Sequence, residues 1–270
     1  MGLGLIGGSL ARAISSLQLA EKVTGWSPQS TERDAALTAG ALTFAAADWR
    51  EAVSDADLVV VAAPLEATRQ LFVALAGAMP EQATITDVVS LKAPIAKAAK
   101  EFGLASRWVG SHPLAGGTTS GFWASRADLF TGARVWTVAH EDARDRIPSV
   151  HRLWAAVGAR PEVIEADVHD RLMAVVSGLP QLVANALAEV IAASGAMPDQ
   201  LGPGGRDMTR LAGSSPDMWI DLLTHAPAEL PTGLRDVAES LKRLADHIED
   251  GDTESIRRIM RETQRWSGSR

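Results

Sequence analysis

The stretch "GLGLIGGSLARAI", Gly2 to Ile14, decides how the first half of this chain folds. Glycines at positions 2, 4 and 7 form the pattern G-x-G-x-x-G, and a helix-favouring segment follows. Such glycines allow a tight turn and a close backbone approach to a pyrophosphate, which the free N–H groups and dipole of a helix N-terminus attract. The residues predicted to contact a dinucleotide here are Gly2, Gly4, Leu5, Ile6 and Gly7.

Only Met1 precedes this loop, although the motif ordinarily follows a central buried strand. Without that strand, the neighbouring strands of a parallel sheet would expose unpaired backbone groups. We therefore expect that translation begins upstream and that the first strand is truncated in this sequence.

Short apolar runs alternate with helical segments after the loop. "ADLVVVAAP" (Ala56 to Pro64) is typical of a strand covered on both faces, and a helix is predicted from about Glu66 to Met79. This alternation implies parallel βαβ units. Beyond residue 165 only helical patterns remain, including a long apolar segment that contains Pro180. The sequence predicts an α/β, Rossmann-like dinucleotide-binding domain over residues 1–165 and an all-helical domain over 166–270.

Composition argues against several classes of protein. The net charge of −7 argues against nucleic acid as a partner, and the absence of cysteine excludes disulfides and thiolate metal sites. We predict no metal. No uninterrupted apolar run approaches the roughly 20 residues of a membrane span, and no signal peptide is apparent. We expect a soluble cytoplasmic protein that does not associate with membranes.

The end of the second predicted strand bears on the choice of cofactor. Ser27, in "GWSPQS", stands where an Asp or Glu usually binds the ribose 2′-hydroxyl. Without a carboxylate a 2′-phosphate is not repelled, and Arg33 could lie nearby, so the sequence favours NADP without excluding NAD. Alternatively, the segment is only a solvated turn. Pro64, at the end of a later strand, is a further predicted cofactor contact.

Longer motifs then follow in a fixed order. They are "TDVVSLK" (Thr86 to Lys92), "GSHPLAGGTTSGFWASRADLFTGARV" (Gly110 to Val135), "HDRLMAVVSGLPQLVANALA" (His169 to Ala188) and "GPGGRDMTRLAGSSPDMW" (Gly202 to Trp219). Together with the glycine loop, they resemble the prephenate/arogenate dehydrogenase family of tyrosine biosynthesis over nearly the whole chain.

The resemblance implies a dinucleotide-binding domain followed by a helical domain that forms a homodimer. It also implies an NAD- or NADP-dependent oxidative decarboxylation of a cyclohexadienol to 4-hydroxyphenylpyruvate or tyrosine. "GGTTSG" (116–121) replaces an acidic or larger polar residue often found there in the family. Prephenate and arogenate therefore both remain candidate substrates.

Two catalytic residues are implied. His112, in "GSHP", matches the family's catalytic histidine, and a neutral imidazole can accept a hydroxyl proton. Ser90, in "DVVSLK", matches the serine that orients this histidine by a hydrogen bond. Without the resemblance, His112 would be a capped turn residue and Ser90 the N-cap of the next helix.

Four substrate contacts are also implied. Arg210 matches the arginine that pairs with a substrate carboxylate, a role that the guanidinium fork suits. His169 matches a histidine that lines the site, Asp207 a position that shapes it, and Thr118 lies in a segment that touches the substrate side chain. Alternatively, Arg210 is a surface residue and His169 pairs with Asp170 at a helix N-terminus.

Two other functions fit the domain pattern. One is another NAD(P)-dependent dehydrogenase with a helical second domain, of the imine reductase or β-hydroxyacid type, which would lack "SHPLAG". The other is a nucleotide-binding module without activity.

Overall fold

A computed structural model of the chain describes residues 1–117 and 119–268. The chain divides into two compact units. The first comprises Met1–Met173 and Gly213–Ala226, and the second comprises Ala174–Ala212 and Pro227–Arg270.

The first unit is built around short strands in a Rossmann-like arrangement. The strands are β1 (Thr24–Gly25), β2 (Phe44–Ala45), β3 (Leu58–Val61), β4 (Thr84–Asp87), β5 (Val109–Pro113), β6 (Arg134–Ala139) and β7 (Arg160–Val163). Strand β1 pairs with β2, β3 with β4, and β6 with β7, all in parallel. A single parallel bridge between Ile85 and Trp108 links β4 to the segment just before β5.

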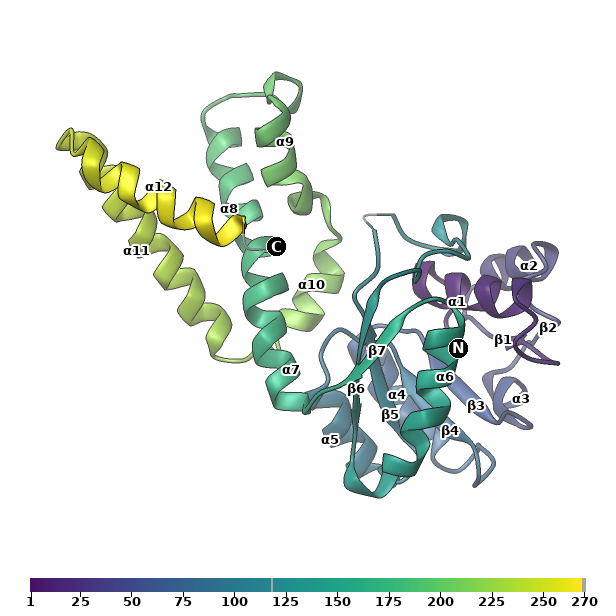
Figure 1. Ribbon diagram of the computed structural model, residues 1–270. Helices are drawn as coiled ribbons and strands as arrows, with labels where there is room; N and C mark the ends of the chain where they lie inside the picture. The colour runs from purple at the N-terminus through teal and green to yellow at the C-terminus, as the bar shows by residue number, and fades with distance from the viewer. Residues whose placement is uncertain (118, 269–270) are drawn as a thin grey trace. The chain divides into compact units, whose positions relative to one another are not determined.

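Helices cover both faces of these strands (Figure 1). The helices of this unit are α1 (Leu5–Ser16), α2 (Ser30–Thr38), α3 (Trp49–Val53), α4 (Leu65–Leu75), α5 (Ala93–Glu101), α6 (Ile147–Ala156), α7 (Ala166–Met173) and α10 (Pro216–Leu223). Local sequence explains several helix starts. Asp48 caps α3 through the N–H of Arg50, and proline occupies the first turn of α5, α6 and α10.

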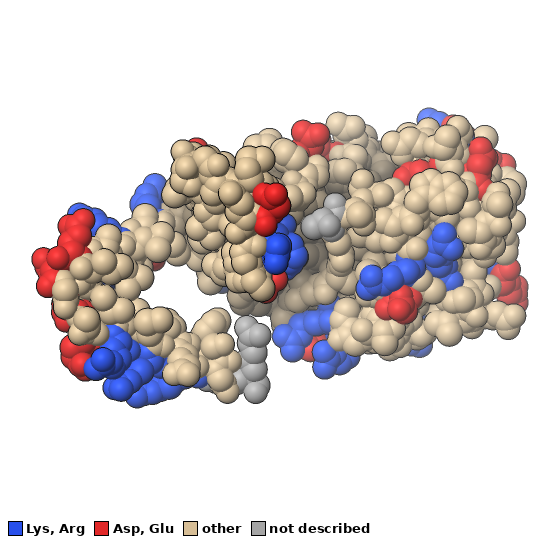
Figure 2. Space-filling model, turned by 90° about the horizontal axis from the view of Figure 1, so that it is seen from above, with Lys and Arg blue, Asp and Glu red and all other residues tan. Residues whose placement is uncertain are grey.

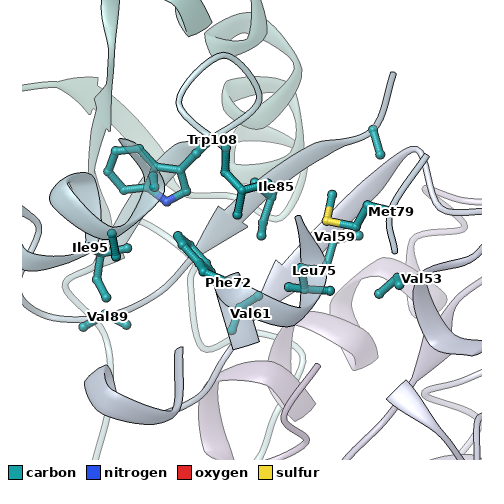
Figure 3. Packing of buried hydrophobic residues seen from close by; sticks show 14 of the residues in the cluster. Val53, Val59, Val61, Phe72, Leu75, Met79, Ile85, Val89, Ile95 and Trp108 are labelled. Carbon is teal, nitrogen blue, oxygen red and sulfur yellow. The ribbon is translucent and has the colours of Figure 1, made fainter. Parts of the chain in front are cut away.

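Strand β3 lies between two hydrophobic clusters. Val59 and Val61 belong to one hydrophobic cluster with residues of α4 and α5, of which Figure 3 shows Phe72, Leu75 and Ile95. The alternate residues Leu58 and Val60 pack against a second cluster, to which α1, α6, β5, β6 and the segments between them contribute. Side chains alternate along a strand, so β3 is covered on both faces. The prediction of a strand buried on both sides is confirmed.

The first two residues lie between β1 and β3. The N–H of Gly2 donates to the carbonyl of Trp26 at 2.7 Å, and the N–H of Ala62 donates to the carbonyl of Met1 at 2.7 Å. The amino group of Met1 donates to the carbonyl of Val60 at 2.7 Å. The glycine loop is therefore fixed to the carboxyl ends of two parallel strands.

Strand β5 departs from the predicted parallel pattern. It pairs antiparallel with β6, with His112 opposite Trp136. Between them lies a connection that includes the short 3₁₀ helix η1 (Phe122–Ala124) rather than an α-helix. A parallel pair needs a crossover, usually a helix, and no such pattern lies between these strands. The expectation of parallel pairing was wrong at this one strand pair.

The second unit is helical throughout its described residues. It contains the π-helix η3 (Ala174–Gly178), α8 (Leu179–Ala193), η4 (Pro198–Gln200), α9 (Pro203–Thr209), η5 (Arg210–Gly213), α11 (Glu229–Glu249) and α12 (Thr253–Ser267). Pro180 lies in the first turn of α8, directly after the π-helical turn. Because proline has no N–H and its ring crowds the preceding turn, it disturbs the regular helical ladder there.

One helical segment is more apolar than the sequence analysis expected. From Ala166 to Ala193 the chain is helical for 28 residues, with a mean hydropathy of 1.5 in an 18-residue window and 22% of that window buried. By length and composition this segment could cross a membrane, and the search for uninterrupted apolar runs missed it. Polar residues interrupt the run, among them Gln181, whose amide donates to Asn185 at 2.8 Å.

Acidic and basic side chains are mixed on the surface. Figure 2 shows blue and red groups interspersed over the face that it presents. Along α12, ion pairs join Arg257 to Glu254 at 3.3 Å and Arg258 to Glu262 at 3.9 Å. The arginines of this helix are thus partly neutralised by neighbouring acids.

The glycine loop generates a stability prediction. A Cβ at Gly7 would lie 1.9 Å from the carbonyl oxygen of Gly2, whereas a Cβ at Gly4 would meet nothing within 4 Å. Gly7→Ala should lower the free energy of unfolding by about 3 kcal/mol, since backbone must shift to admit the methyl group. Gly4→Ala, the matched control, should change it by less than about 0.5 kcal/mol. Urea denaturation followed by circular dichroism measures both, and equal stability of the two variants would contradict this geometry.

Candidate active site

The glycine loop fits the pyrophosphate of a dinucleotide. Gly2 has a φ of 85°, and a Cβ on it would lie 2.1 Å from the carbonyl oxygen of Ala62. Gly4 is the N-cap of α1 and makes no side-chain cap, so no side chain covers the first N–H groups of the helix. Open space at Gly4 and uncapped N–H groups together form a cradle for an anionic group.

The other predicted cofactor residues lie around this loop in the first unit. Leu5 and Ile6 form the first turn of α1, and their side chains pack partly against the second core cluster. Pro64 is the N-cap of α4, just after β3 and two residues beyond Ala62, against which Gly2 packs.

Ser27 has an acidic neighbour that the sequence analysis did not anticipate. The Ser27 hydroxyl donates to Oε2 of Glu32 at 2.6 Å, and Arg33 Nη1 donates to the Ser27 carbonyl at 2.5 Å. Ser27 itself is 1% exposed. A carboxylate and a guanidinium therefore both stand at the end of β1, supplied by the first turn of α2.

A buried ion pair lies at the end of β4. The ammonium of Lys92 contacts Asp87 Oδ1, and both side chains are 0% exposed. Asp87 also accepts hydrogen bonds from the indole of Trp108 at 2.8 Å and from the N–H of Val89 at 2.9 Å. Burial lowers the pKa of Lys92, and the carboxylates of Asp87 and Asp170 oppose that effect.

Lys92 also connects the ion pair to β5, the strand that carries His112. Its ammonium donates to the carbonyl of Ser111 at 2.7 Å. The Ser111 hydroxyl lies 2.9 Å from Thr86 Oγ1 and accepts from the indole of Trp154 at 2.9 Å. The backbone immediately before His112 is thus held from three sides.

Two histidines and a carboxylate form a chain of hydrogen bonds. Nδ1 of His112 lies 2.9 Å from Nε2 of His169, and Nδ1 of His169 lies 2.7 Å from Oδ1 of Asp170. Asp170 also accepts from the N–H groups of Lys92 and Ala93, both at 2.8 Å. The carboxylate that orients His169 therefore also caps the N-terminus of α5.

The surroundings keep His112 neutral. Its pKa lies well below the ordinary value of 6.5, first because burial disfavours the charged ring, and then because a positive charge on His112 would be unfavourable beside the His169 ring and the ammonium of Lys92. A neutral imidazole near pH 7 can accept a proton. His112 as a whole residue is neither fully buried nor exposed, so it lies close to the surface of its unit.

Ser90 is placed differently from its prediction by the structure. Ser90 lies in the bend before α5, whose N-cap is Lys92, so the alternative of Ser90 as that N-cap is wrong. Across the described residues, the side chain that contacts Nδ1 of His112 is His169, and Ser90 makes no hydrogen bond to this ring. Thr118 lies outside the described residues.

Arg210 and Asp207 belong to the second unit. Asp207 lies in α9, and Arg210 is the C-cap residue of the same helix. Both residues are exposed, and within the described part of the chain Arg210 forms no ion pair with a carboxylate. Its guanidinium is available to an anionic ligand.

Four residues of these networks were not singled out as site residues by the sequence analysis: Glu32, Asp87, Lys92 and Asp170. Asp87 and Lys92 flank Ser90 within "TDVVSLK", and Asp170 follows His169 directly. Asp and Lys are rarely buried unless they are paired. An acid or a lysine within a mainly apolar segment is therefore the sequence pattern that could have revealed Asp87, Lys92 and Asp170.

The comparisons with known proteins agree with this arrangement. Residues 10–163 match the prephenate dehydrogenase nucleotide-binding domain, and residues 165–262 match the prephenate dehydrogenase dimerization domain. The chain belongs to the prephenate dehydrogenase family. The prediction made from the sequence motifs is confirmed, as is the order of a nucleotide-binding domain and a helical dimerization domain.

Relatives of this family match almost the entire chain. The prephenate dehydrogenase of Bacillus subtilis is 30% identical over 96% of this chain and 72% of its own length. The cyclohexadienyl dehydrogenase of Zymomonas mobilis is 31% identical over 98% of this chain and 92% of its own length. A solved prephenate dehydrogenase from A. aeolicus, in complex with hydroxyphenyl propionate and NAD+, superposes with a TM-score of 0.88 at 27% identity, covering 97% and 94% of the two chains.

The buried ion pair generates a prediction. Lys92→Met should lower the free energy of unfolding by about 3–5 kcal/mol, because Asp87 would keep a buried charge without its partner. Lys97→Met, an exposed lysine on the same helix, is the control and should change stability by less than about 0.5 kcal/mol. Adding Asp87→Asn to Lys92→Met should restore part of the loss. Chemical denaturation measures all three, and a loss under about 1 kcal/mol for Lys92→Met would contradict the unpaired-charge argument.

Proposed function

We propose that this chain is an NAD(P)-dependent dehydrogenase that converts prephenate to 4-hydroxyphenylpyruvate, or arogenate to tyrosine, with release of CO2. Family membership supports the reaction class. The observation that carries the proposal is His112, a partly exposed residue with a neutral imidazole whose Nδ1 is engaged by His169. Its Nε2 remains to accept a proton from a ring hydroxyl.

The chemistry of the chain's own residues follows from that position. His112 takes the proton of the hydroxyl on the dienol ring as the hydride leaves the same carbon. NAD(P)+, when bound, supplies the hydride acceptor. The C–C bond to the ring carboxylate then breaks, CO2 departs, and the bond pair enters the ring, which becomes aromatic. The imidazolium of His112 returns its proton to the resulting phenolate, so the base is regenerated.

For the cofactor we propose NAD+ in preference to NADP+. The carboxylate of Glu32 at Ser27 would repel a 2′-phosphate, while a ribose hydroxyl could donate to it. Arg33 is engaged with the Ser27 carbonyl. Gly2, Gly4, Leu5, Ile6, Gly7 and Pro64 are the remaining proposed cofactor contacts.

For the substrate we propose that Arg210 binds a carboxylate. Its guanidinium is exposed and can form two parallel hydrogen bonds to an anionic oxygen pair. Asp207 and Thr118 remain proposed substrate contacts on the strength of the family motif, and Ser90 remains a proposed catalytic residue. His169, predicted as a substrate contact from the same motif, is 0% exposed and has both ring nitrogens engaged, so we propose that it acts on the substrate through His112.

We also propose a homodimer formed by the helical domain, with residues 1–165 and 166–270 as the functional domains. Large apolar side chains on the second unit support this, because they are exposed in the single chain. Val190 is 68% exposed, Ile248 68% and Met260 65%. We propose that a second copy of the chain, rather than lipid, packs against these apolar side chains. We also propose that the protein is cytoplasmic.

Steady-state assays test the proposed reaction. Wild-type protein should reduce NAD+ with prephenate or arogenate, and His112→Asn should lower kcat by at least about 100-fold while leaving NAD+ affinity nearly unchanged, as loss of a general base does. The acid limb of kcat/KM should lie below pH 6.5, because only the neutral ring accepts a proton and its pKa is lowered.

His225→Asn, an exposed histidine of the same chain, is the control and should retain wild-type kcat. Near-normal turnover by His112→Asn would remove His112 from the proposed role. Absence of NAD+ or NADP+ reduction with both substrates would refute the proposed reaction itself.

The proposed role of Arg210 gives a separate prediction. Arg210→Ala should raise KM for the substrate by about 10-fold or more with a smaller change in kcat, since a carboxylate contact is present before and during the reaction. Arg210→Lys should restore only part of the affinity, because an ammonium cannot form the bidentate pair. Arg152→Ala, an exposed arginine on α6, is the control. An unchanged KM in Arg210→Ala would exclude the carboxylate contact.

A further inference from the structure

The hydrogen-bond chain from Asp170 to His112 constrains where each proton can lie. Asp170 is 5% exposed and His169 is 0% exposed, so water does not compete for these groups. An ionised carboxylate can only accept hydrogen bonds, and here it already accepts two from backbone N–H groups at the start of α5. It therefore faces a donor at Nδ1 of His169.

A neutral His169 that carries its proton on Nδ1 has an unprotonated Nε2, which can only accept a hydrogen bond. The atom 2.9 Å from this Nε2 is Nδ1 of His112, which must then be the donor of their hydrogen bond. A neutral imidazole carries one proton, so Nε2 of His112 is left with its lone pair free. If the neutral His169 instead carried its proton on Nε2, the lone pair of its Nδ1 would face a lone pair of the Asp170 carboxylate.

We propose that Asp170 is a positioning residue that fixes the tautomer of His112 through His169, so that Nε2 of His112 is the proton acceptor. This inference rests on the proposed function, in which His112 is the base. When His112 takes a proton on Nε2, its Nδ1–H continues to donate to His169, and the positive ring is stabilised through His169 by the Asp170 carboxylate. No proton passes from His112 to His169 or Asp170, and the proton on Nε2 of His112 returns to the phenolate.

Lys92, Asp87 and Asp170 are charged groups that the described residues bring to this hydrogen-bond chain. From α5 and the bend before it come Lys92 and, through it, the Asp87 carboxylate. From α7 comes Asp170 itself. Lys92 is neutralised by Asp87, so Asp170 is the carboxylate left to orient the histidine pair.

A test without substrate comes from nitrogen NMR of the full chain labelled with ¹⁵N-histidine. The spectrum should show His112, assigned by its loss in His112→Asn, as the Nδ1–H tautomer. In Asp170→Asn the carboxamide NH2 can donate to His169, and His112 should change to the Nε2–H tautomer. Asp167→Asn, an exposed carboxylate earlier on α7, is the matched control and should leave the signals unchanged. A wild-type His112 that carries its proton on Nε2 would overturn the proposal.

Kinetics supply the second readout. Asp170→Asn should lower kcat by at least about 100-fold with KM within about twofold, as expected when a base is held in the wrong tautomer. An unchanged kcat would overturn the proposal. Because the tautomer is read in the free protein, it decides the inference even where prephenate and arogenate are not turned over.

A pair of His169 variants keeps the proposal testable if Asp170→Asn does not fold. In His169→Gln the amide oxygen can still accept from Nδ1 of His112, and kcat should stay within about 10-fold of wild type. His169→Leu removes the acceptor and should lower kcat by about 100-fold without raising KM. A rise in KM alone, or equal kcat in the two variants, would instead make His169 a substrate contact and overturn the relay.

Discussion

The carboxylate of Asp87 is the constraint on which the candidate base depends. It lies at the end of β4 and accepts from Trp108, from Val89 and from the buried ammonium of Lys92. Through Lys92, the same charge is tied to the carbonyl of Ser111, the residue before His112. An unpaired buried charge is costly, so these groups have little freedom to move apart. Electrostatic pairing, more than apolar packing, sets where the imidazole stands.

The same principle links α7 to the start of α5. Asp170 lies on α7, yet its two oxygens accept from N–H groups at the start of α5 and from His169. One side chain thus satisfies a helix N-terminus and orients a histidine. The three contacts restrain the carboxylate so that it cannot rotate to serve one role without losing another.

Much of the fold could be predicted because local patterns carry it. The glycine loop, the apolar run of β3 and the change to helical periodicity after residue 165 each follow from short-range sequence. The antiparallel pairing of β5 with β6 was not predicted. The lack of a helical crossover between them argues against a parallel pair, but which strands become neighbours depends on contacts that a local pattern does not give. The apolar character of Ala166–Ala193 was underestimated because Gln181 and Asn185 interrupt the run while satisfying each other.

The site was predictable to a smaller extent. His112 was identified through its motif, but its partner is His169, 57 residues away, and not the nearby Ser90. No local pattern tells which nitrogen of a ring is engaged, since that follows from tertiary contacts. Glu32 was missed for a related reason: it reaches Ser27 only because the first turn of α2 folds back on the end of β1.

The reason for a glycine at position 4 differs from the reason at positions 2 and 7. Gly2 and Gly7 are required by crowding against Ala62 and against each other, whereas a methyl group at Gly4 would project into empty space. Evolutionary constraint at positions 2 and 7 would thus come from folding, and at position 4 from the ligand alone. Alanine at position 4 would therefore separate the two properties, because its methyl group meets no protein atom within 4 Å yet would stand in the pyrophosphate cradle.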